Sequence, residues 1–150
     1  MKLAEALIER ADLQKKIAQV ESRMEQNAKV QEGDEPAEAV DKLMSQYEDL
    51  MDSLEALIIR INRTNANVSF EDMTLADAIA KRDCLKSKIR AYRDLHEAAS
   101  IYHDRYSNKE IKFVRCVDVV ELQAKIDRLS KAYREIDTKM QGLNWTIDLL

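Results

Sequence analysis

Apolar residues recur in steps of three and four along most of this chain, the spacing that places them on one face of an α-helix. The first series predicts a helix over about residues 2–31, and its apolar seam is interrupted by Arg10 and Asn27. Polar residues on such a seam lower stability unless they find a partner, so they penalise wrong alignments of the packed helices. We expect Arg10 and Asn27, together with Arg82 farther along the chain, to set the register of the helices.

Gly33 and Pro36 predict where this helix ends and the next one begins. Glycine suits the left-handed position after a helix, and proline suits the first helical turn. The second helix is predicted over about residues 36–62. Because the connection is short, the two helices should lie antiparallel. The apolar face of the second helix is wide, which favours more than one neighbour.

The stretch from residue 61 to residue 74 interrupts the helical spacing and holds three asparagines within six residues. Asn, Ser and Asp side chains bond to their own backbone and favour turns and caps. We therefore predict a connection between two helices at residues 61–74. The alternative interpretation is a small polar binding site made together with another loop.

The helical spacing resumes at Leu75 and predicts a third helix over about residues 75–106. Its seam is unusually polar, because Arg82, His96 and His103 lie along it. We expect the two histidines at the edge of the core.

A fourth helix is predicted over about residues 118–141, with the most regular apolar spacing in the chain. Asp118 and Glu121 predict its N-terminal cap. The four helices together predict an all-α protein, an antiparallel bundle of long, coiled-coil-like helices. The length of 150 residues fits a single domain over residues 1–150.

Residues 110–117 lack helical spacing and are rich in β-branched and aromatic side chains, which predicts a short extended segment. Ile111 and Phe113 lie on one side of it and are expected to form an interface. Residues 144–149 favour a second extended piece, in which Trp145 should anchor the chain end. Because a lone strand leaves backbone groups unpaired, we expect pairing between these two pieces, or between copies of the chain.

Charge is unevenly distributed along the chain. Residues 32–55 hold nine acidic side chains against Lys42 alone, and residues 81–93 hold six basic side chains against Asp83 alone. Opposite charges on consecutive helices favour mutual pairing; the alternative is a nucleic-acid surface on the basic helix. The net charge of -4 would repel nucleic acid and anionic membranes, so we expect neither as a partner.

The beginning of the chain carries charges every few residues, which argues against a secretory signal. No window approaches the roughly 18 continuous apolar residues that span a bilayer. The cysteines Cys84 and Cys116 lie in no disulfide pattern. We therefore predict reduced thiols and a cytoplasmic location.

The inventory of reactive groups does not predict an enzyme. A di-iron site in a helical bundle needs Glu three residues before His on two helices, but here Arg93 precedes His96 and Ser100 precedes His103. Neither cysteine lies in a recognisable nucleophile motif, and neither glycine lies in a phosphate-binding loop. We predict no catalytic residue, no metal and no cofactor.

Several stretches of the chain together resemble the septicolysin-like family of small bacterial helical proteins. They are MKLAEALIERADLQKKI, NAKVQEGDEP, INRTN, the Arg82-Asp83 pair, DRYSNKEIKFVRCVDVVELQ and NWTIDLL. The resemblance covers nearly the whole chain and implies a long-helix fold with an uncharacterised cytoplasmic role. At INRTN it implies a positioned polar cluster of Asn62, Arg63 and Asn65, without naming a ligand.

The sequence therefore predicts a non-enzymatic cytoplasmic scaffold or interaction protein. It should form homo-oligomers through its helix faces and the 110–117 segment. One alternative, implied by the family name, is a membrane-active, thiol-dependent cytolysin. The other is an RNA-binding helical hairpin centred on Lys81 to Arg93.

Overall fold

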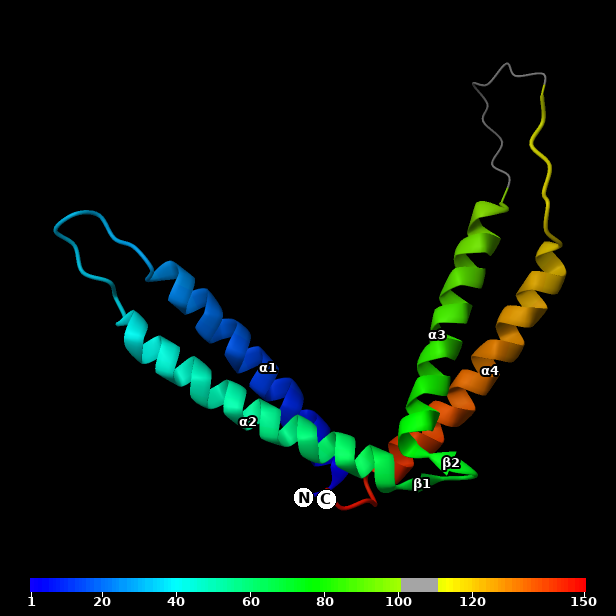
Figure 1. Ribbon diagram of the computed structural model, residues 1–150. Helices are drawn as coiled ribbons and strands as arrows, with labels where there is room; N and C mark the ends of the chain where they lie inside the picture. Colours follow the sequence, from blue (N-terminus) through cyan, green and yellow to red (C-terminus); the bar gives the residue numbers. More distant parts are fainter. Residues whose placement is uncertain (101–110) are drawn as a thin grey trace. The chain divides into compact units, whose positions relative to one another are not determined.

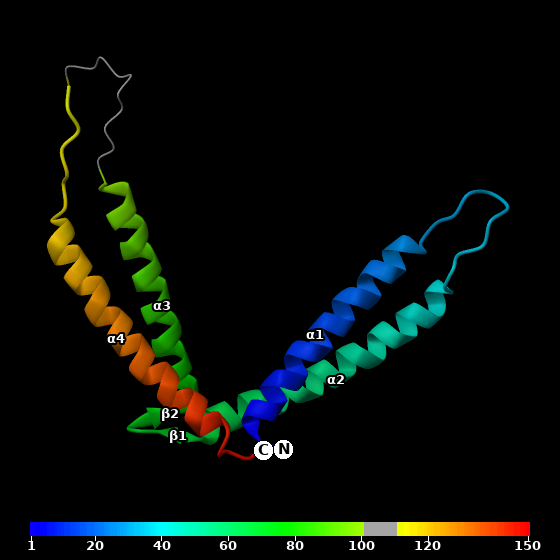
Figure 2. The same ribbon diagram turned by 180° about the vertical axis from the view of Figure 1, so that it is seen from behind.

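The computed structural model describes residues 1–100 and 111–150 (Figures 1 and 2). The predicted all-α class is confirmed. The helices of the described residues are α1 (Leu3–Gln26), α2 (Val40–Asn67), α3 (Leu75–Ala98) and α4 (Val119–Asn144). Two short strands, β1 (Ser69–Phe70) and β2 (Met73–Thr74), pair in an antiparallel hairpin between α2 and α3. The chain divides into two compact units, Met1–Leu75 with Gln141–Leu150, and Ala76–Met140; the single domain stays a prediction.

In the first unit, α1 and α2 run antiparallel and lie side by side (Figure 1). Their facing surfaces carry the regularly spaced apolar residues that the sequence predicted. The buried ones are Leu3, Ala4, Ala6, Ile17 and Val20 of α1, and Leu43, Leu54, Leu57 and Ile61 of α2. Burial of apolar surface contributes roughly 25 cal/mol per Å², so this continuous seam is the main source of stability of the hairpin.

The connection between α1 and α2 is longer than predicted, because α1 ends at Gln26 instead of near residue 31 and α2 begins at Val40 instead of near residue 36. Asn27 terminates α1. Its Nδ2 donates to the carbonyl oxygen of Arg23 at 2.8 Å, and its Oδ1 accepts from the backbone N–H of Glu38 at 3.1 Å. An Asn that bonds backbone groups in this way favours a cap over a continued helix.

Helix α2 continues to Asn67, beyond its predicted end near residue 62, so the predicted connection between two helices was wrong for residues 63–67. Ile61 and Thr64 are buried there, at 1% and 0% exposure. Buried contacts outweigh the low helix propensity of asparagine, which is a weak preference. The connection is reduced to the β1–β2 hairpin, where Glu71 takes a positive φ of 54° that glycine adopts more readily.

The C-terminal residues pair with the N-terminus of the same unit. The N–H of Leu3 donates to the carbonyl oxygen of Ile147 at 3.0 Å, and the N–H of Leu149 donates to that of Met1 at 2.9 Å. Lys2 and Asp148 form an isolated antiparallel bridge between these bonds. The prediction of an extended piece over residues 144–149 was therefore wrong for Asn144, which ends α4, and for the turn at Trp145 and Thr146. Only the end of this piece, around Asp148, is paired, and its partner is the chain's own beginning.

In the second unit, α3 and α4 run antiparallel (Figure 2). Their backbones approach one another less closely than those of α1 and α2. Their buried apolar residues are Ala78, Ile89, Leu122, Ile126 and Met140. Asp118 caps α4 as predicted, since its Oδ1 accepts from the backbone N–H of Val120 at 3.0 Å and of Glu121 at 3.1 Å. Helix α3 begins at Leu75 as predicted but ends at Ala98, short of the predicted end near residue 106. His103 lies outside the described residues.

Residues 111–117 belong to no helix and have no strand partner among the described residues. Glu110, the first residue of the predicted extended segment, lies outside them. The expected pairing of this segment with residues 144–149 is absent from the described part of the chain, because the latter residues bond to residues 1–3 instead.

Candidate functional site

The residues of the predicted polar cluster lie in the last turns of α2. Asn62 and Arg63 are exposed, Asn65 is half-buried, and the carbonyl oxygen of Arg63 accepts from Asn67 Nδ2 at 2.8 Å. Asn62 and Asn65 are three positions apart and lie on neighbouring positions of one helix face, whereas Arg63 points in another direction. The binding site at this cluster stays a prediction.

Thr64 is the polar residue of this region that the prediction missed. Its hydroxyl donates to the carbonyl oxygen of Arg60 at 2.9 Å and accepts from the backbone N–H of Leu150 at 3.0 Å. The side chain thereby holds the C-terminal residue against α2. Its burial could have been predicted from the spacing of the sequence, because Thr64 follows Leu57 and Ile61 at the next position of the apolar seam.

The residues predicted to set the register occupy different environments. Arg10 is half-buried on α1, and Asn27 is the cap of that helix. Arg82 bonds Asp83 Oδ1 through Nε at 3.0 Å and Nη2 at 2.9 Å, and it reaches Asp137 Oδ1 of α4 through Nη1 at 3.4 Å. Burial favours a lower pKa for Arg82, but the hydrogen bond and the charge of Asp83, with Asp137, raise it.

Ion pairs close the ends of the first unit. Arg23 of α1 bonds Glu38 with two nitrogens, and this hydrogen bonding lowers the pKa of the Glu38 carboxyl. Lys2 Nζ lies 2.8 Å from Asp148 Oδ1, and the hydrogen bond from Lys2 likewise lowers the pKa of Asp148. Both pairs join residues that are distant in sequence, so they help to hold the ends of this unit together.

The predicted interface residues Ile111 and Phe113 are 88% and 83% exposed, and Val114 beside them is 85% exposed. The predicted anchor Trp145 is 56% exposed, whereas Leu149 is buried in the same terminal segment. Leu149 is therefore the apolar residue through which this segment docks in the first unit.

An apolar groove adjoins the segment 111–117 at the C-terminal end of α3. Its volume is ≈ 740 Å³, within the usual range of ligand sites, and its lining includes Leu95, Ala99 and Val114. Arg115 Nε donates to the carbonyl oxygen of Ala99 at 2.9 Å, which ties the segment to the end of α3.

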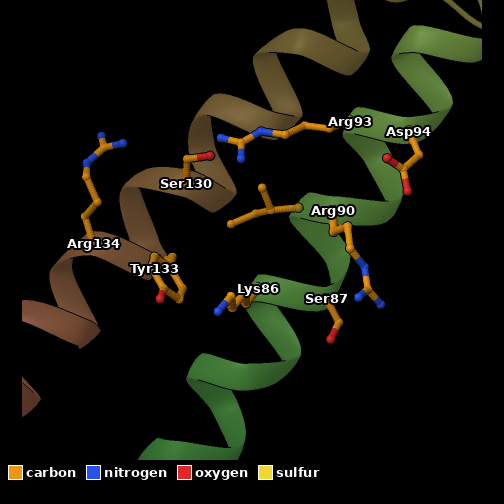
Figure 3. Close-up of a pocket in the computed structure, with 9 residues that line it drawn as sticks. Lys86, Ser87, Arg90, Arg93, Asp94, Ser130, Tyr133 and Arg134 are labelled. Carbon is orange, nitrogen blue, oxygen red and sulfur yellow. The ribbon is translucent and has the colours of Figure 1, made fainter.

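A second groove lies between α3 and α4 and is rich in basic side chains (Figure 3). Its volume is ≈ 590 Å³. It is lined by Lys86, Ser87, Ile89, Arg90, Arg93 and Asp94 of α3, and by Ser130, Tyr133 and Arg134 of α4. Lys86 and Arg93 extend from α3 toward α4, where Ser130 and Tyr133 face them (Figure 3). We refer to it as the α3–α4 groove.

Among residues 1–100 and 111–150, no helix combines the length and the apolar composition needed to cross a membrane. Within the same ranges, no group of three or more His, Cys, Asp or Glu side chains is placed to hold a metal ion. Cys84 and Cys116 are both exposed, free thiols.

These features define an all-α protein of helical hairpins whose candidate sites are surface grooves. The model of a family described as a family of unknown function (DUF6847) matches residues 10–149, and the chain belongs to this family. It is also similar to a protein of known structure, described as a functionally unknown conserved protein from Corynebacterium diphtheriae. The two share 41% sequence identity with a TM-score of 0.93, over 100% of this chain and 99% of that chain.

No curated protein matches the chain. None of these comparisons supports the septicolysin-like resemblance, and the neighbour with a solved structure is itself described as functionally unknown.

Proposed function

We propose that this protein is a non-enzymatic interaction protein that associates with a second copy of itself through residues 111–117. The observation that carries the proposal is the exposure of three neighbouring large apolar side chains, Ile111, Phe113 and Val114, each above four-fifths. Contiguous exposed apolar surface is rare on monomers and marks interaction sites. Burying these side chains against a partner would remove them from water.

The sequence of the segment fits pairing with an identical copy. If two copies pair antiparallel with Phe113 opposite Phe113, Lys112 faces Val114 and Arg115 faces Ile111. No like charges then stand opposite one another, and the two aromatic rings meet at the centre. A two-fold arrangement of this kind is the commonest symmetry of protein dimers.

The adjoining apolar groove offers a surface for the partner's side chains. Leu95, at 44% exposure, and the small residues Ala98 and Ala99 form the α3 side of this groove. Small side chains leave room for a bulky one, so Phe113 of a second copy is a suitable occupant.

Sedimentation velocity of the protein between about 1 and 100 µM tests self-association. This range covers the weak to moderate affinities of transient dimers. We expect a larger sedimentation coefficient at high concentration. The variant Phe113→Asp should remain monomeric, because a charge opposite its own copy repels.

The matched control is Val120→Asp, which places the same charge at a side chain that is 77% exposed on α4. This variant should associate like the parent. A parent protein that stays monomeric throughout, or two variants with equal effects, would show that the segment is not the interface.

Crosslinking tests the geometry of the pair. In a background with Cys84→Ser and Cys116→Ser, a mixture of Lys112→Cys and Val114→Cys proteins should form disulfide-linked heterodimers under mild oxidation. Residues directly opposite across an antiparallel pair have Cβ atoms about 5 Å apart, within reach of a disulfide after small adjustments. A mixture of Lys112→Cys and Val120→Cys proteins is the control. Equal crosslinking in both mixtures would contradict the proposed register.

A further inference from the structure

The lining of the α3–α4 groove includes four basic residues, Lys86, Arg90, Arg93 and Arg134, and one acidic residue, Asp94. Within the described residues, none of the four basic side chains forms an ion pair. Lys86 and Arg93 are the two that extend toward α4 (Figure 3). Arg82, on the same helix, is by contrast paired with Asp83 and Asp137. An excess of positive charge in a concave site raises the local concentration of anions.

A buried hydroxyl in the groove also lacks a partner. The Oγ atom of Ser130 is buried and makes no hydrogen bond within the described residues. Buried polar groups in proteins are nearly always hydrogen-bonded, so an exception calls for an explanation. Figure 3 shows the guanidinium of Arg93 extending from α3 toward Ser130. An anionic oxygen placed between these two groups would accept a hydrogen bond from each.

The rest of the groove is suited to an apolar body. Ile89 is 6% exposed between the two helices, and the ring of Tyr133 is half-buried on α4. The volume of ≈ 590 Å³ lies within the usual range of small-ligand sites and exceeds what a single phosphate group fills. The geometry therefore favours a ligand with a charged end and a flat or apolar end.

We propose that the α3–α4 groove binds a small organic phosphate. Its phosphate group lies between Arg93, Lys86 and the hydroxyl of Ser130. Its ring or apolar body packs against Ile89 and Tyr133. Guanidinium groups suit this role because they donate two parallel hydrogen bonds to phosphate oxygens.

The short reach of the groove favours a small ligand over an RNA strand. On α3 its lining runs from Lys86 to Asp94, about two helical turns. The neighbouring basic residues Lys81 and Lys88 do not line it. A nucleic-acid surface would need basic residues to continue along the path of successive phosphates.

Isothermal titration calorimetry at low salt, with adenosine monophosphate as the probe, tests the proposal. Adenosine and inorganic phosphate serve as the two halves of the probe. We expect each half to bind at least about tenfold more weakly than the whole, because each lacks one set of contacts. Inorganic phosphate that binds as tightly as the whole probe would overturn the assignment to an organic phosphate. A short single-stranded RNA that binds more than about tenfold tighter per strand than the nucleotide would overturn it in favour of an RNA surface.

Variants then locate the site. Arg93→Gln should weaken nucleotide binding at least about tenfold, since it removes a charged donor to the phosphate. Lys88→Ala is the matched control, because it removes one charge from the same helix outside the groove, and it should change the affinity less than about twofold. Equal effects of the two variants would mean that only net charge matters, which contradicts a built site.

Ser130→Ala separates a binding role from a structural one. The hydroxyl has no protein partner to lose, and alanine is the better helix former, so the free protein should melt at the same or a higher temperature. Nucleotide binding should nevertheless weaken severalfold. A lower melting temperature together with unchanged nucleotide affinity would show that the hydroxyl supports the fold, and the proposed site would be wrong.

Discussion

The two helical hairpins of this protein use the same secondary structure in different ways. The backbones of α1 and α2 approach within 8 Å repeatedly, whereas those of α3 and α4 scarcely do. The difference follows from the residues between the helices. Leu, Ile, Val and Ala fill the first seam, while arginine, lysine, serine and tyrosine interrupt the second. A continuous apolar seam closes a hairpin, and an interrupted one leaves a groove.

The connections between the two helices of each hairpin also differ, since one is closed by polar contacts and the other exposes apolar side chains. In the first, Asn27 and Arg23 both bond to Glu38, which closes the loop with polar contacts. In the second, Ile111 and Phe113 are almost fully exposed. Stability and candidate binding surfaces are therefore separated between the two hairpins.

The largest expected effect comes from the closed seam. Ile61→Ala should lower the free energy of unfolding by about 3–4 kcal/mol, since the substitution leaves a cavity in a continuous core. Ile89→Ala should cost less, about 2 kcal/mol, the lower end of the range for such substitutions, because the removed methyl groups adjoin an open groove that can relax. Urea unfolding of both variants measures the difference. Equal costs would show that the second hairpin is packed as tightly as the first.

Removing the C-terminal segment, residues 145–150, should have the next largest effect. Truncation after Asn144 deletes the buried side chain of Leu149 and the backbone bonds to residues 1–3, so we expect a loss of about 3 kcal/mol. Replacing Trp145 by alanine is the control within the same segment and should cost less, because that side chain is more than half exposed. Thermal melting of the two variants would contradict this account if the order were reversed.

The polar contact across the second hairpin should contribute less. Asp137→Ala leaves Arg82 with Asp83 alone and should lower stability by about 1 kcal/mol. The double replacement Arg82→Leu with Asp137→Leu should retain or raise the melting temperature, because the polar pair sets register at some cost in stability. The same replacement should weaken the self-association that sedimentation measures, because the register of the helices is less well defined. Unchanged melting and unchanged sedimentation of the double variant would mean that Arg82 has no role in register.

The smallest expected effect is a loss of stability as the pH falls. The pKa values of Glu38 and Asp148 are lowered in the folded protein by hydrogen bonds from Arg23 and Lys2. A lowered folded-state pKa stabilises the fold above the unfolded-state value, near 4, and this contribution is lost as the pH falls through the folded-state pKa. The difference in melting temperature between the parent and Asp148→Asn should therefore shrink from pH 7 toward pH 3. A constant difference would contradict the assignment.

Local patterns were sufficient to predict much of the fold. The apolar spacing located four helices, and Asp118 marked the start of α4 because capping depends on neighbouring residues alone. Glu121 follows it at the expected position. The ends of the helices were less predictable. The last turns of α2 depend on Thr64 meeting Leu150, a contact between residues 86 positions apart.

The candidate sites were predictable only in part. Ile111 and Phe113 stood out because apolar and charged residues alternate there. The α3–α4 groove combines residues of two helices, and the missing partner of Ser130 becomes visible only once the helices are packed. The sequence indicated a basic helix, but the spacing between α3 and α4 depends on their long intervening side chains.

Amide hydrogen exchange at two protein concentrations tests the central claim most directly. We compare exchange at about 1 µM and about 100 µM, below and above the affinity expected of a weak dimer. The account predicts slower exchange at the higher concentration for residues 111–117, and no change for the closed connection at residues 27–39. Unchanged exchange at residues 111–117, or an equal change in both connections, would contradict the separation of stability and self-association between the two hairpins.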